Sequence, residues 1–391
     1  MKVDKSKWAE TAFAEIATSQ LGKTLDANKN KGLPYPYLCA ANIGMGYFNL
    51  SNVKEILLDD SELEKYLVRK GDLLICEGGD TGRCAIWESE DPIYYQNALH
   101  RVRFNDDIHN KFIMYYLHYY KKVGIIDKLS HGQTIKHFTQ KGLSKLSFRM
   151  PTVSEQKGIA SELDAIQAMI DGYNAQLHDL DELIKSIFND TFGEPISNPK
   201  GWDVDILENI VSDDCPITYG IVQPGDDVNE GIPVVRPVDL IGTYVNKTFL
   251  KKVSPEISDS YKRTILKGNE ILICVRGTTG VVSFATEDMK GCNVTRGIVP
   301  LSFIRHNKWF MYWCIKSYEM NNLIQKYTKG ATLKQINIKD LRQLPFPTPP
   351  LELQEKFGKQ AELIETQRAL LNQQISDARN LMAERMQYYF S

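Results

Sequence analysis

The chain has 391 residues, more than one hydrophobic core usually holds, so two or more domains are expected. Apolar residues make up 42% and charged residues 25%, which excludes a disordered or collagen-like protein, and the net charge of −2 excludes a uniformly basic one. The sequence has no run of 18 apolar residues, and its first residues lack an apolar signal segment, so neither secretion nor a membrane span is expected. Seven scattered cysteines without a CxxC pattern argue against disulfides and zinc and fit a cytoplasmic protein.

A mixed α/β unit is predicted for residues 1–152. The apolar run Leu73–Cys76 before a glycine-rich turn is typical of a short strand. The aromatic stretch Phe112–Tyr120 predicts a core-facing helix, with stacking on bases as the alternative. Residues 101–149 hold ten Lys or Arg and three Asp, a net charge of +7 that suits contact with phosphate or a solvated face.

Residues 153–193 are predicted to form one long helix. Thr152 and Glu155 match a capping box, and Gly193 stands where a helix stop belongs. About 38 residues of helix at 1.5 Å per residue reach roughly 57 Å, the length of a spacer, although packing on its own domain is the alternative. Eight acids and two Lys give residues 153–192 a net charge of −6. The apolar positions follow the a/d spacing of a coiled coil over four heptads: Ile159, Leu163, Ile166, Ile170, Tyr173, Leu177, Leu180, Ile184 and Ile187.

Residues 194–350 repeat the first unit after a Gly/Pro/Asn joint at 193–201. Gly132–Gln156 recurs 198 residues later as Gly330–Gln354, with nine of 25 positions identical. Residues 299–347 are again basic, with eight Lys or Arg and two acids. Two further matches lie upstream, Leu73–Cys76 with Ile271–Cys274, and Lys111–Tyr115 with Lys308–Tyr312 at a slightly shorter offset.

A second long helix is predicted for residues 351–391. Arg368 and Arg385 occupy seam positions, where they could pair with acids of the first helix. The apolar members of its seam are Phe357, Ala361, Ile364, Leu371, Ile375, Ala378 and Met382.

Motifs of catalysis are missing from the sequence. It contains no GxxxxGK[ST], no GxGxxG after a strand, no HExxH, no GxSxG and no N/D-P-P-F/Y tetrapeptide. Five histidines between residues 100 and 137 lack the spacing of metal ligands, so a solvated or phosphate-facing role is expected for them. We therefore expect no catalytic site, cofactor or metal.

Polar and basic residues at tight turns are the candidates for DNA contact. Glu77–Arg83 and Val275–Gly280 occupy equivalent places, either as DNA-reading turns or as plain hairpin turns. The duplicated Gly-x-Thr-x-Lys at 132–136 and 330–334 suits phosphate contact or a loop-to-helix cap. The full candidate set is Arg83, Asn97, Arg101, Thr134, Lys136, Arg236, Arg276, Thr278, Thr279, Arg296, Thr332 and Lys334.

The proline-rich leads Arg149–Gln156 and Leu344–Gln354, the Gly-x-Thr-x-Lys loops before them and Tyr219–Gly225 resemble those of type I restriction-modification specificity subunits over the whole chain. Gln20–Lys23 departs from the pattern, because nothing there answers Tyr219–Gly225. The resemblance implies two target-recognition domains, each reading half of a split double-stranded DNA site, with the long helices antiparallel. It also implies two adenine methyltransferase subunits and motor-nuclease subunits as partners.

These observations predict an α+β fold, a tandem duplication of an α/β domain followed by a long helix. The expected divisions are a first recognition domain at 1–152, a central helix at 153–193, a second recognition domain at 194–350 and a final helix at 351–391. Two alternatives stay open at this point. One is a coiled-coil scaffold without nucleic-acid function, and the other is an enzyme whose active site matches no motif.

Overall fold

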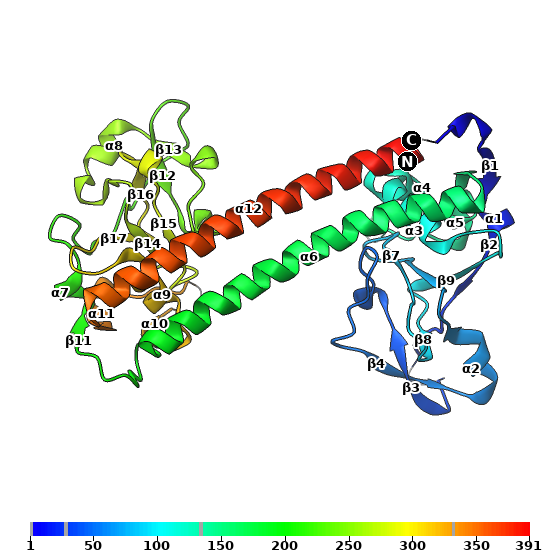
Figure 1. Ribbon diagram of the computed structural model, residues 1–391, viewed down its shortest axis with the longest axis horizontal. Coiled ribbons are helices and arrows are strands. Elements are labelled where there is room, and N and C mark those ends of the chain that lie inside the picture. The colour runs from blue at the N-terminus through cyan, green and yellow to red at the C-terminus, as the bar shows by residue number, and fades with distance from the viewer. Residues whose placement is uncertain (1–2, 27–29, 133–135, 331–332) are drawn as a thin grey trace. The chain divides into compact units, whose positions relative to one another are not determined.

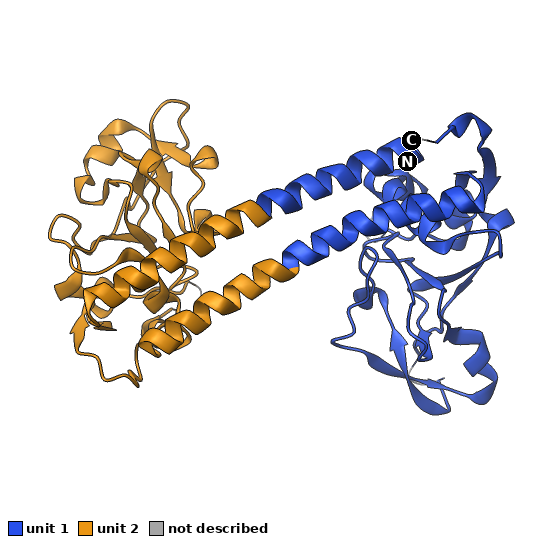
Figure 2. Ribbon diagram, viewed as in Figure 1, with its two compact units in different colours: residues 1–174, 372–391 blue, residues 175–371 orange. Residues whose placement is uncertain are grey.

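The computed structural model describes residues 3–26, 30–132, 136–330 and 333–391. These fall into two compact units: unit 1 comprises residues 1–174 and 372–391, and unit 2 comprises residues 175–371 (Figure 2). Both units mix helices and short strands (Figure 1). Each of the two long helices, α6 (Val153–Phe192) and α12 (Leu351–Phe390), contributes one part to unit 1 and the other part to unit 2.

Unit 1 contains two four-stranded sheets, with strand orders β2-β9-β6-β7 and β4-β3-β8-β5, and the pair β1-β10. Strand β6 is buried at all four residues because β7 and β9 flank it and helix α3 covers the sheet, which explains its uninterrupted apolar sequence. The elements are η1 (Lys5–Lys7), β1 (Ala9–Ala12), α1 (Phe13–Ile16), β2 (Ala17–Leu21), β3 (Leu33–Leu38), η2 (Ala40–Asn42), β4 (Lys54–Leu58), α2 (Asp60–Tyr66), β5 (Leu67–Val68), β6 (Leu73–Cys76), β7 (Cys84–Ile86), β8 (Ile93–Tyr95), β9 (Leu99–Phe104), α3 (Asn110–Lys122), α4 (Ile125–Leu129), α5 (Gln140–Leu143) and β10 (Ser147–Met150).

Unit 2 repeats this plan with shorter sheets, β15-β14-β17, β13-β12-β16 and β11-β18. Strand β14 is antiparallel to β15 and β17, as β6 is to β7 and β9. The elements are β11 (Val204–Ile206), α7 (Leu207–Ile210), β12 (Ile232–Val235), η3 (Pro237–Asp239), η4 (Lys247–Phe249), β13 (Lys251–Val253), α8 (Pro255–Asp259), η5 (Lys262–Thr264), β14 (Ile271–Cys274), β15 (Val282–Phe284), η6 (Glu287–Met289), β16 (Asn293–Val294), β17 (Ile298–Leu301), α9 (Lys308–Lys316), α10 (Tyr318–Tyr327), α11 (Ile338–Arg342) and β18 (Pro345–Pro347).

The duplicated proline-to-glutamine lead joins each long helix to the start of the aromatic helix of its unit. The side chain of Gln156 accepts a hydrogen bond from the main-chain N–H of His109 at 2.8 Å and donates to Pro151 O at 3.1 Å. Gln354 accepts from the N–H of Asn307 at 3.0 Å and donates to Pro349 O at 2.8 Å. This glutamine therefore has the same structural task in both units.

The same contacts correct the predicted alignment of the aromatic helices. Because His109 and Asn307 are equivalent, the offset stays at 198 residues and does not shorten. Phe112 packs on Phe390 in unit 1, and Phe310 packs on Phe192 in unit 2, which follows the same offset. Lys111 is thus the counterpart of Trp309 and not of Lys308. Matching the identical residues of the two segments gives an alignment that is shifted by one residue from the structural one.

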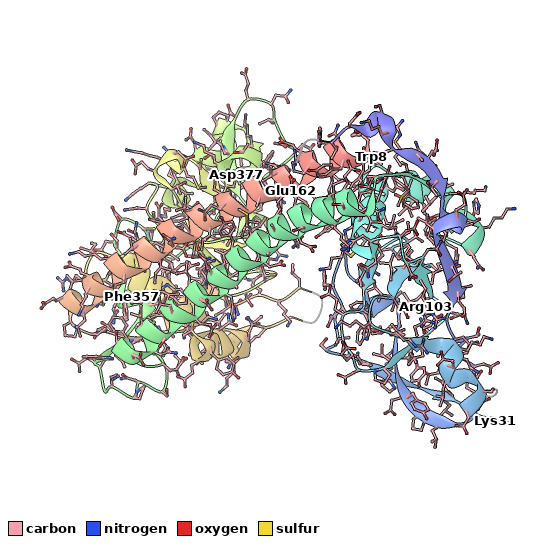
Figure 3. The ribbon with its side chains drawn as sticks, turned by 45° about the vertical axis from the view of Figure 1, so that its right-hand side comes forward. Trp8, Lys31, Arg103, Glu162, Phe357 and Asp377 are labelled. Atoms are coloured by element: carbon pink, nitrogen blue, oxygen red, sulfur yellow. The ribbon has the colours of Figure 1, made fainter. Side chains whose placement is uncertain are left out.

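The two long helices are antiparallel within each unit. In unit 1, Glu162 of α6 accepts hydrogen bonds from Arg385 and from the Tyr389 hydroxyl of α12. In unit 2, Asp181 of α6 pairs with Arg368 of α12. Figure 3 labels Glu162 on α6. The expected pairing of the seam arginines with acids of the first helix is confirmed.

The capping box at the start of α6 is also confirmed. The Thr152 N–H donates to the Glu155 carboxylate at 3.1 Å, and the Glu155 N–H donates to the Thr152 hydroxyl at 3.4 Å. The predicted seam residues are buried or half-buried in both helices, whereas most of the positions between them are exposed. The fold prediction of a duplicated α/β domain followed by a long helix therefore holds.

Candidate nucleic-acid interface

In unit 1, the turn after β6 lies against the loop that precedes α5. Phe138 N donates to Glu77 O at 2.6 Å. His131 and His137 exchange two main-chain hydrogen bonds of 2.9 and 2.7 Å, which close the loop between them. Lys136 lies in this loop and is exposed. Two motifs that are separate in the sequence therefore form one site.

Unit 2 repeats this arrangement beside β14. Lys329 and Gln335 exchange two main-chain hydrogen bonds of 2.8 Å each, and Gly277 N donates to Lys334 O at 2.8 Å. Ile336 N donates to Val275 O at 3.0 Å, as Phe138 does to Glu77 in unit 1. Lys334 is exposed, like its counterpart Lys136. The predicted residues Thr134 and Thr332 lie outside the described residues.

The two threonines of the turn after β14 have different surroundings. Thr278 is exposed. Thr279 is buried, and its hydroxyl lies 3.0 Å from that of Thr328, which also donates to Ile324 O. The buried hydroxyl of Thr279 thus holds the turn to helix α10, a structural role in place of the expected DNA contact.

Two of the candidate arginines in unit 2 border one open groove of about 280 Å³. Arg276 comes from the turn after β14, and Arg296 from the turn between β16 and β17. The guanidinium carbon of Arg296 lies 5.7 Å from the centroid of the Tyr219 ring. Arg236 directly precedes Pro237, which lines the groove. The guanidinium of Arg236, however, donates two hydrogen bonds to the carboxylate of Asp239, at 3.1 and 2.9 Å.

The candidates of unit 1 are more varied in exposure. Asn97 is exposed at the turn before β9, in the place that Arg296 takes before β17. Arg83 donates to Ala40 O at 3.0 Å and lies 3.4 Å from the Asp80 carboxylate, so it is partly engaged inside the protein.

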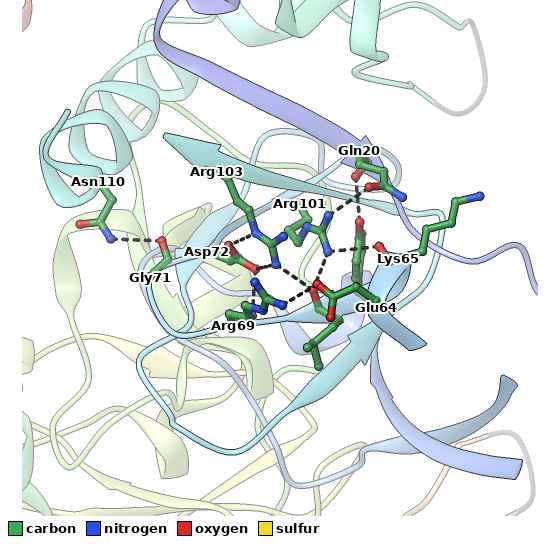
Figure 4. A network of polar contacts seen from close by, with 11 residues as sticks. Gln20, Glu64, Lys65, Arg69, Gly71, Asp72, Arg101, Arg103 and Asn110 are labelled. Atoms are coloured by element: carbon green, nitrogen blue, oxygen red, sulfur yellow. Dashed lines mark hydrogen bonds and ion pairs between the residues drawn. The ribbon is translucent and has the colours of Figure 1, made fainter. Parts of the chain in front are cut away.

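Arg101 lies inside a polar network, which Figure 4 shows. Its guanidinium donates to Gln20 Oε1 at 3.0 Å and to Lys65 O at 3.2 Å. The neighbouring Arg103 forms an ion pair with Asp72 at 2.7 Å. Burial lowers the pKa of Arg101, whose side chain is 7% exposed. The expectation that Arg101 contacts DNA is therefore replaced by a structural role, which ties strand β9 to the end of helix α2.

Equivalent places in the two units carry different side chains on the same main-chain frame. The N–H groups of Cys39 and Arg236 each donate to a side chain three residues on, Asn42 and Asp239 respectively. The other equivalent positions of the two units follow from the strand pairing around β6 in unit 1 and around β14 in unit 2. The pairs that differ are Cys39 and Arg236, Gly78 and Arg276, Asp80 and Thr278, and Asn97 and Arg296, whereas Lys136 and Lys334 are shared.

The segment Gln20–Lys23, in which the sequence shows no counterpart of Tyr219–Gly225, does match that segment in structure at one glycine. A Cβ on Gly22 would lie 2.4 Å from Tyr95 O, and one on Gly220 would lie 2.1 Å from Val294 O. Lys23 then forms a parallel bridge to Gln96, the counterpart of the bridge from Ile221 to Thr295. Gly22 thus answers Gly220, a match that one shared residue was too weak to indicate.

The histidines of unit 1 do not all face solvent as expected. His100 is fully buried, with Nε2 2.8 Å from Phe138 O, and burial lowers its pKa. Burial also lowers the pKa of His118 to about 4, so this side chain is neutral at pH 7. His131 and His137 are exposed at the loop. No group of three metal-ligating side chains occurs within the described residues.

The cysteines provide no activated nucleophile among the groups whose pKa is shifted. Burial raises the pKa of Cys76 and of Cys215 to about 11, and it also raises the pKa of Cys84. These thiols remain protonated at pH 7 and act as small core residues.

The family model described as type I restriction modification DNA specificity domain matches residues 5–180 and 219–377. The EcoBI specificity subunit of Escherichia coli is 26% identical over 341 residues, which cover 81% of this chain and 71% of the relative. The putative MjaX specificity subunit of Methanocaldococcus jannaschii is 26% identical over 376 residues, covering 88% and 83%. The solved S subunit of a type I system from M. genitalium has a TM-score of 0.60 at 15% identity and covers 100% of this chain and 98% of that one.

The chain therefore belongs to the type I restriction-modification DNA specificity family and contains two specificity domains in tandem. It is a DNA-recognition subunit without a catalytic role of its own. None of the helices in the described ranges is both long and apolar enough to cross a membrane.

Proposed function

We propose that each unit reads one half of a bipartite double-stranded DNA site through three neighbouring segments: the turn and loop that meet beside its central strand, and the turn that precedes β9 in unit 1 or β17 in unit 2. The observation that carries this proposal is the repeated frame with different side chains at its tip, for example Gly78 against Arg276 and Asn97 against Arg296. An identical tip would read the same bases twice. Different donors and acceptors on one frame suit two half-sites of different sequence.

The shared lysines have a separate part in this proposal. Lys136 and Lys334 are exposed at equivalent places, each directly before the residue that closes its loop, so both can reach phosphate, which has the same chemistry at every base pair. Arg83, Asn97, Arg236, Arg276, Thr278 and Arg296 remain candidates for base or phosphate contact. Arg101 and Thr279 support the frame from inside.

We further propose residues 1–152 and 194–350 as the recognition domains and residues 153–193 and 351–391 as spacer helices that dock two adenine methyltransferase subunits. Motor-nuclease subunits join the complex for restriction. The net charge of −6 on residues 153–192 supports a protein partner, because phosphate would be repelled by this helix.

A cleft in unit 1 adds support for protein docking beside α6. It has a volume of about 640 Å³, and its apolar wall includes Tyr47 and Trp87. Its carboxylates are Glu88, Asp164 and Asp171, against the single ammonium of Lys111, a net charge of −2. The cleft thus suits an apolar and basic protein surface and disfavours DNA.

The test uses the chain assembled with its methyltransferase subunit. Modified adenines are mapped in a host with and without this gene, and binding to the mapped site is measured against salt concentration. We expect a split sequence whose binding weakens steeply with salt. A coiled-coil scaffold without nucleic-acid function, the second candidate, would leave adenine modification unchanged and show no salt-dependent DNA binding.

A further inference from the structure

The groove of unit 2 holds two arginines without an internal carboxylate partner. Within residues 3–26, 30–132, 136–330 and 333–391, no carboxylate lies within 4.0 Å of the guanidinium of Arg276 or Arg296. Arg236, beside the same groove, differs because Asp239 binds it at 2.9 Å. Arg276 and Arg296 are half-buried, so their charges are fixed at an open surface and available to an external acceptor.

Arg296 is also held in one place by its neighbours. Its main-chain N–H donates to Ile221 O at 2.8 Å, and its guanidinium lies over the ring of Tyr219. Gln335, from the loop at 329–335, donates to the Tyr219 hydroxyl at 3.0 Å. A guanidinium that rests on an aromatic ring loses less freedom when it binds, and its flat fork of N–H donors is presented edge-on.

We propose that Arg296 reads a guanine in the half-site of unit 2, with Tyr219 and Gln335 as positioning residues and Arg276 as a second cation of the groove. This inference rests on the proposed function. Two N–H groups of arginine match the adjacent O6 and N7 acceptors of guanine in the major groove. Adenine presents an amino group in place of O6, so one arginine donor would face another donor.

Unit 1 has different residues at all four positions of this arrangement. The counterpart of Arg296 is Asn97, and the counterpart of Arg276 is Gly78. Leu21 stands in place of Tyr219, and His137, in place of Gln335, bonds to Glu77 at 3.0 Å. An exposed amide offers one donor and one acceptor, the pattern that suits adenine N7 and N6. The guanine read by Arg296 therefore belongs to one half-site only.

The experiment uses the full chain with its methyltransferase subunit and a duplex carrying the mapped site. Each guanine of the half-site assigned to unit 2 is replaced in turn by 7-deazaguanine, which lacks the N7 acceptor. At one position we expect binding of the wild type to weaken by about 5- to 100-fold. The Arg296→Ala complex should bind the normal site less tightly and show no further loss at that position. Arg305→Ala is the matched control, because Arg305 is exposed beyond the far end of β17.

Two variants of Tyr219 separate positioning from folding. Tyr219→Phe keeps the ring face and should keep most of the guanine preference, whereas Tyr219→Ala should reduce the preference even when binding is measured well below its melting temperature, which loss of the half-buried ring lowers. The inference is overturned if the half-site contains no guanine that responds to 7-deazaguanine, or if wild type and Arg296→Ala lose the same factor. The first of these results is obtained with the wild type alone, so the proposal can be overturned even if a variant fails to fold. Failure to find a split, salt-dependent site would instead overturn the proposed function itself.

Discussion

A fragment of residues 1–192 tests whether the two long helices are interchangeable. Because α12 repeats α6 at an offset of 198 residues, a second fragment could supply its own α6 where α12 packs on unit 1. Phe192 of the second copy would then take the place of Phe390 against Phe112. The apolar seam favours an antiparallel dimer, and neither helix is stable alone in water. We expect the fragment to dimerise.

The ion pairs of the seam are lost when a second α6 takes the place of α12. The residues 198 positions before Arg385 and Arg368 are Ile187 and Ile170, so Glu162 and Asp181 would both face isoleucine. A symmetric dimer loses four ion pairs in this way. The side chains of Glu162 and Asp181 are 29% and 44% exposed, so each pair is worth about 0.2–1 kcal/mol. The total of about 1–4 kcal/mol corresponds to a dimer weaker by roughly 5- to 1000-fold than one with the pairs intact.

Two variants of the fragment isolate this contribution. Ile187→Arg restores the partner of Glu162, and Ile187→Gln removes the same apolar surface without adding a charge. Sedimentation equilibrium should give the Arg variant a dimer dissociation constant about 2- to 30-fold lower than that of the Gln variant, and the difference should shrink at high salt. Equal constants would show that the pairs contribute nothing.

The oligomeric state of the fragment tests whether the two long helices are interchangeable. A fragment that stays monomeric at tens of micromolar, in high as well as low salt, would show that the helices are not interchangeable. If the dimer forms, symmetry in the protein dictates symmetry in the site. With the methyltransferase subunit supplied, the fragment should modify an inverted repeat of the first half-site at a spacing close to that of the parent.

Three further predictions concern the full chain. Replacing Lys136 and Lys334 by Ala should weaken binding to all DNA sequences and lower the salt slope by about 2, measured by titration at several salt concentrations, and an unchanged slope would remove them from the interface. Exchanging the residues before Met150 for those of a relative should change one half of the modified sequence, as read from mapped adenines, and a change in both halves would indicate one composite reader. Burial lowers the pKa of His118 to about 4, so stability should fall as pH drops from about 6.5 towards 4, and His118→Gln should flatten this part of the unfolding curve whereas the exposed His178→Gln should not.

The sequence predicted the long helices well because their stabilising pattern is local and repeats. A heptad seam is visible in the spacing of apolar residues, and Arg368 and Arg385 were recognisable as exceptions to it. The capping box before α6 was visible for the same reason, since Thr152 and Glu155 are three residues apart. Features that depend on residues close in sequence were therefore predictable.

The exposure of the candidate arginines was not predictable in the same way. Arg101 and Arg296 both stand in basic segments near a strand, and no local pattern separates them. Arg101 is buried because Gln20 and the end of helix α2, distant in sequence, enclose its guanidinium. Arg296 is half-exposed, with its guanidinium over the ring of Tyr219 at the border of an open groove. Which arginine faces a ligand depends on these long-range contacts.

The structure also indicates how one frame can serve two different readers. In both units two main-chain hydrogen bonds, between His131 and His137 and between Lys329 and Gln335, hold the base of the loop, and this pairing does not depend on the exposed side chains. The buried hydroxyls of Thr81 and Thr279 lie against helix residues in equivalent ways. Substitution of an exposed tip residue consequently removes few internal contacts and costs little folding free energy. Base preference and stability are therefore separable at the tip, whereas a change at Thr279 would alter the frame and both properties together.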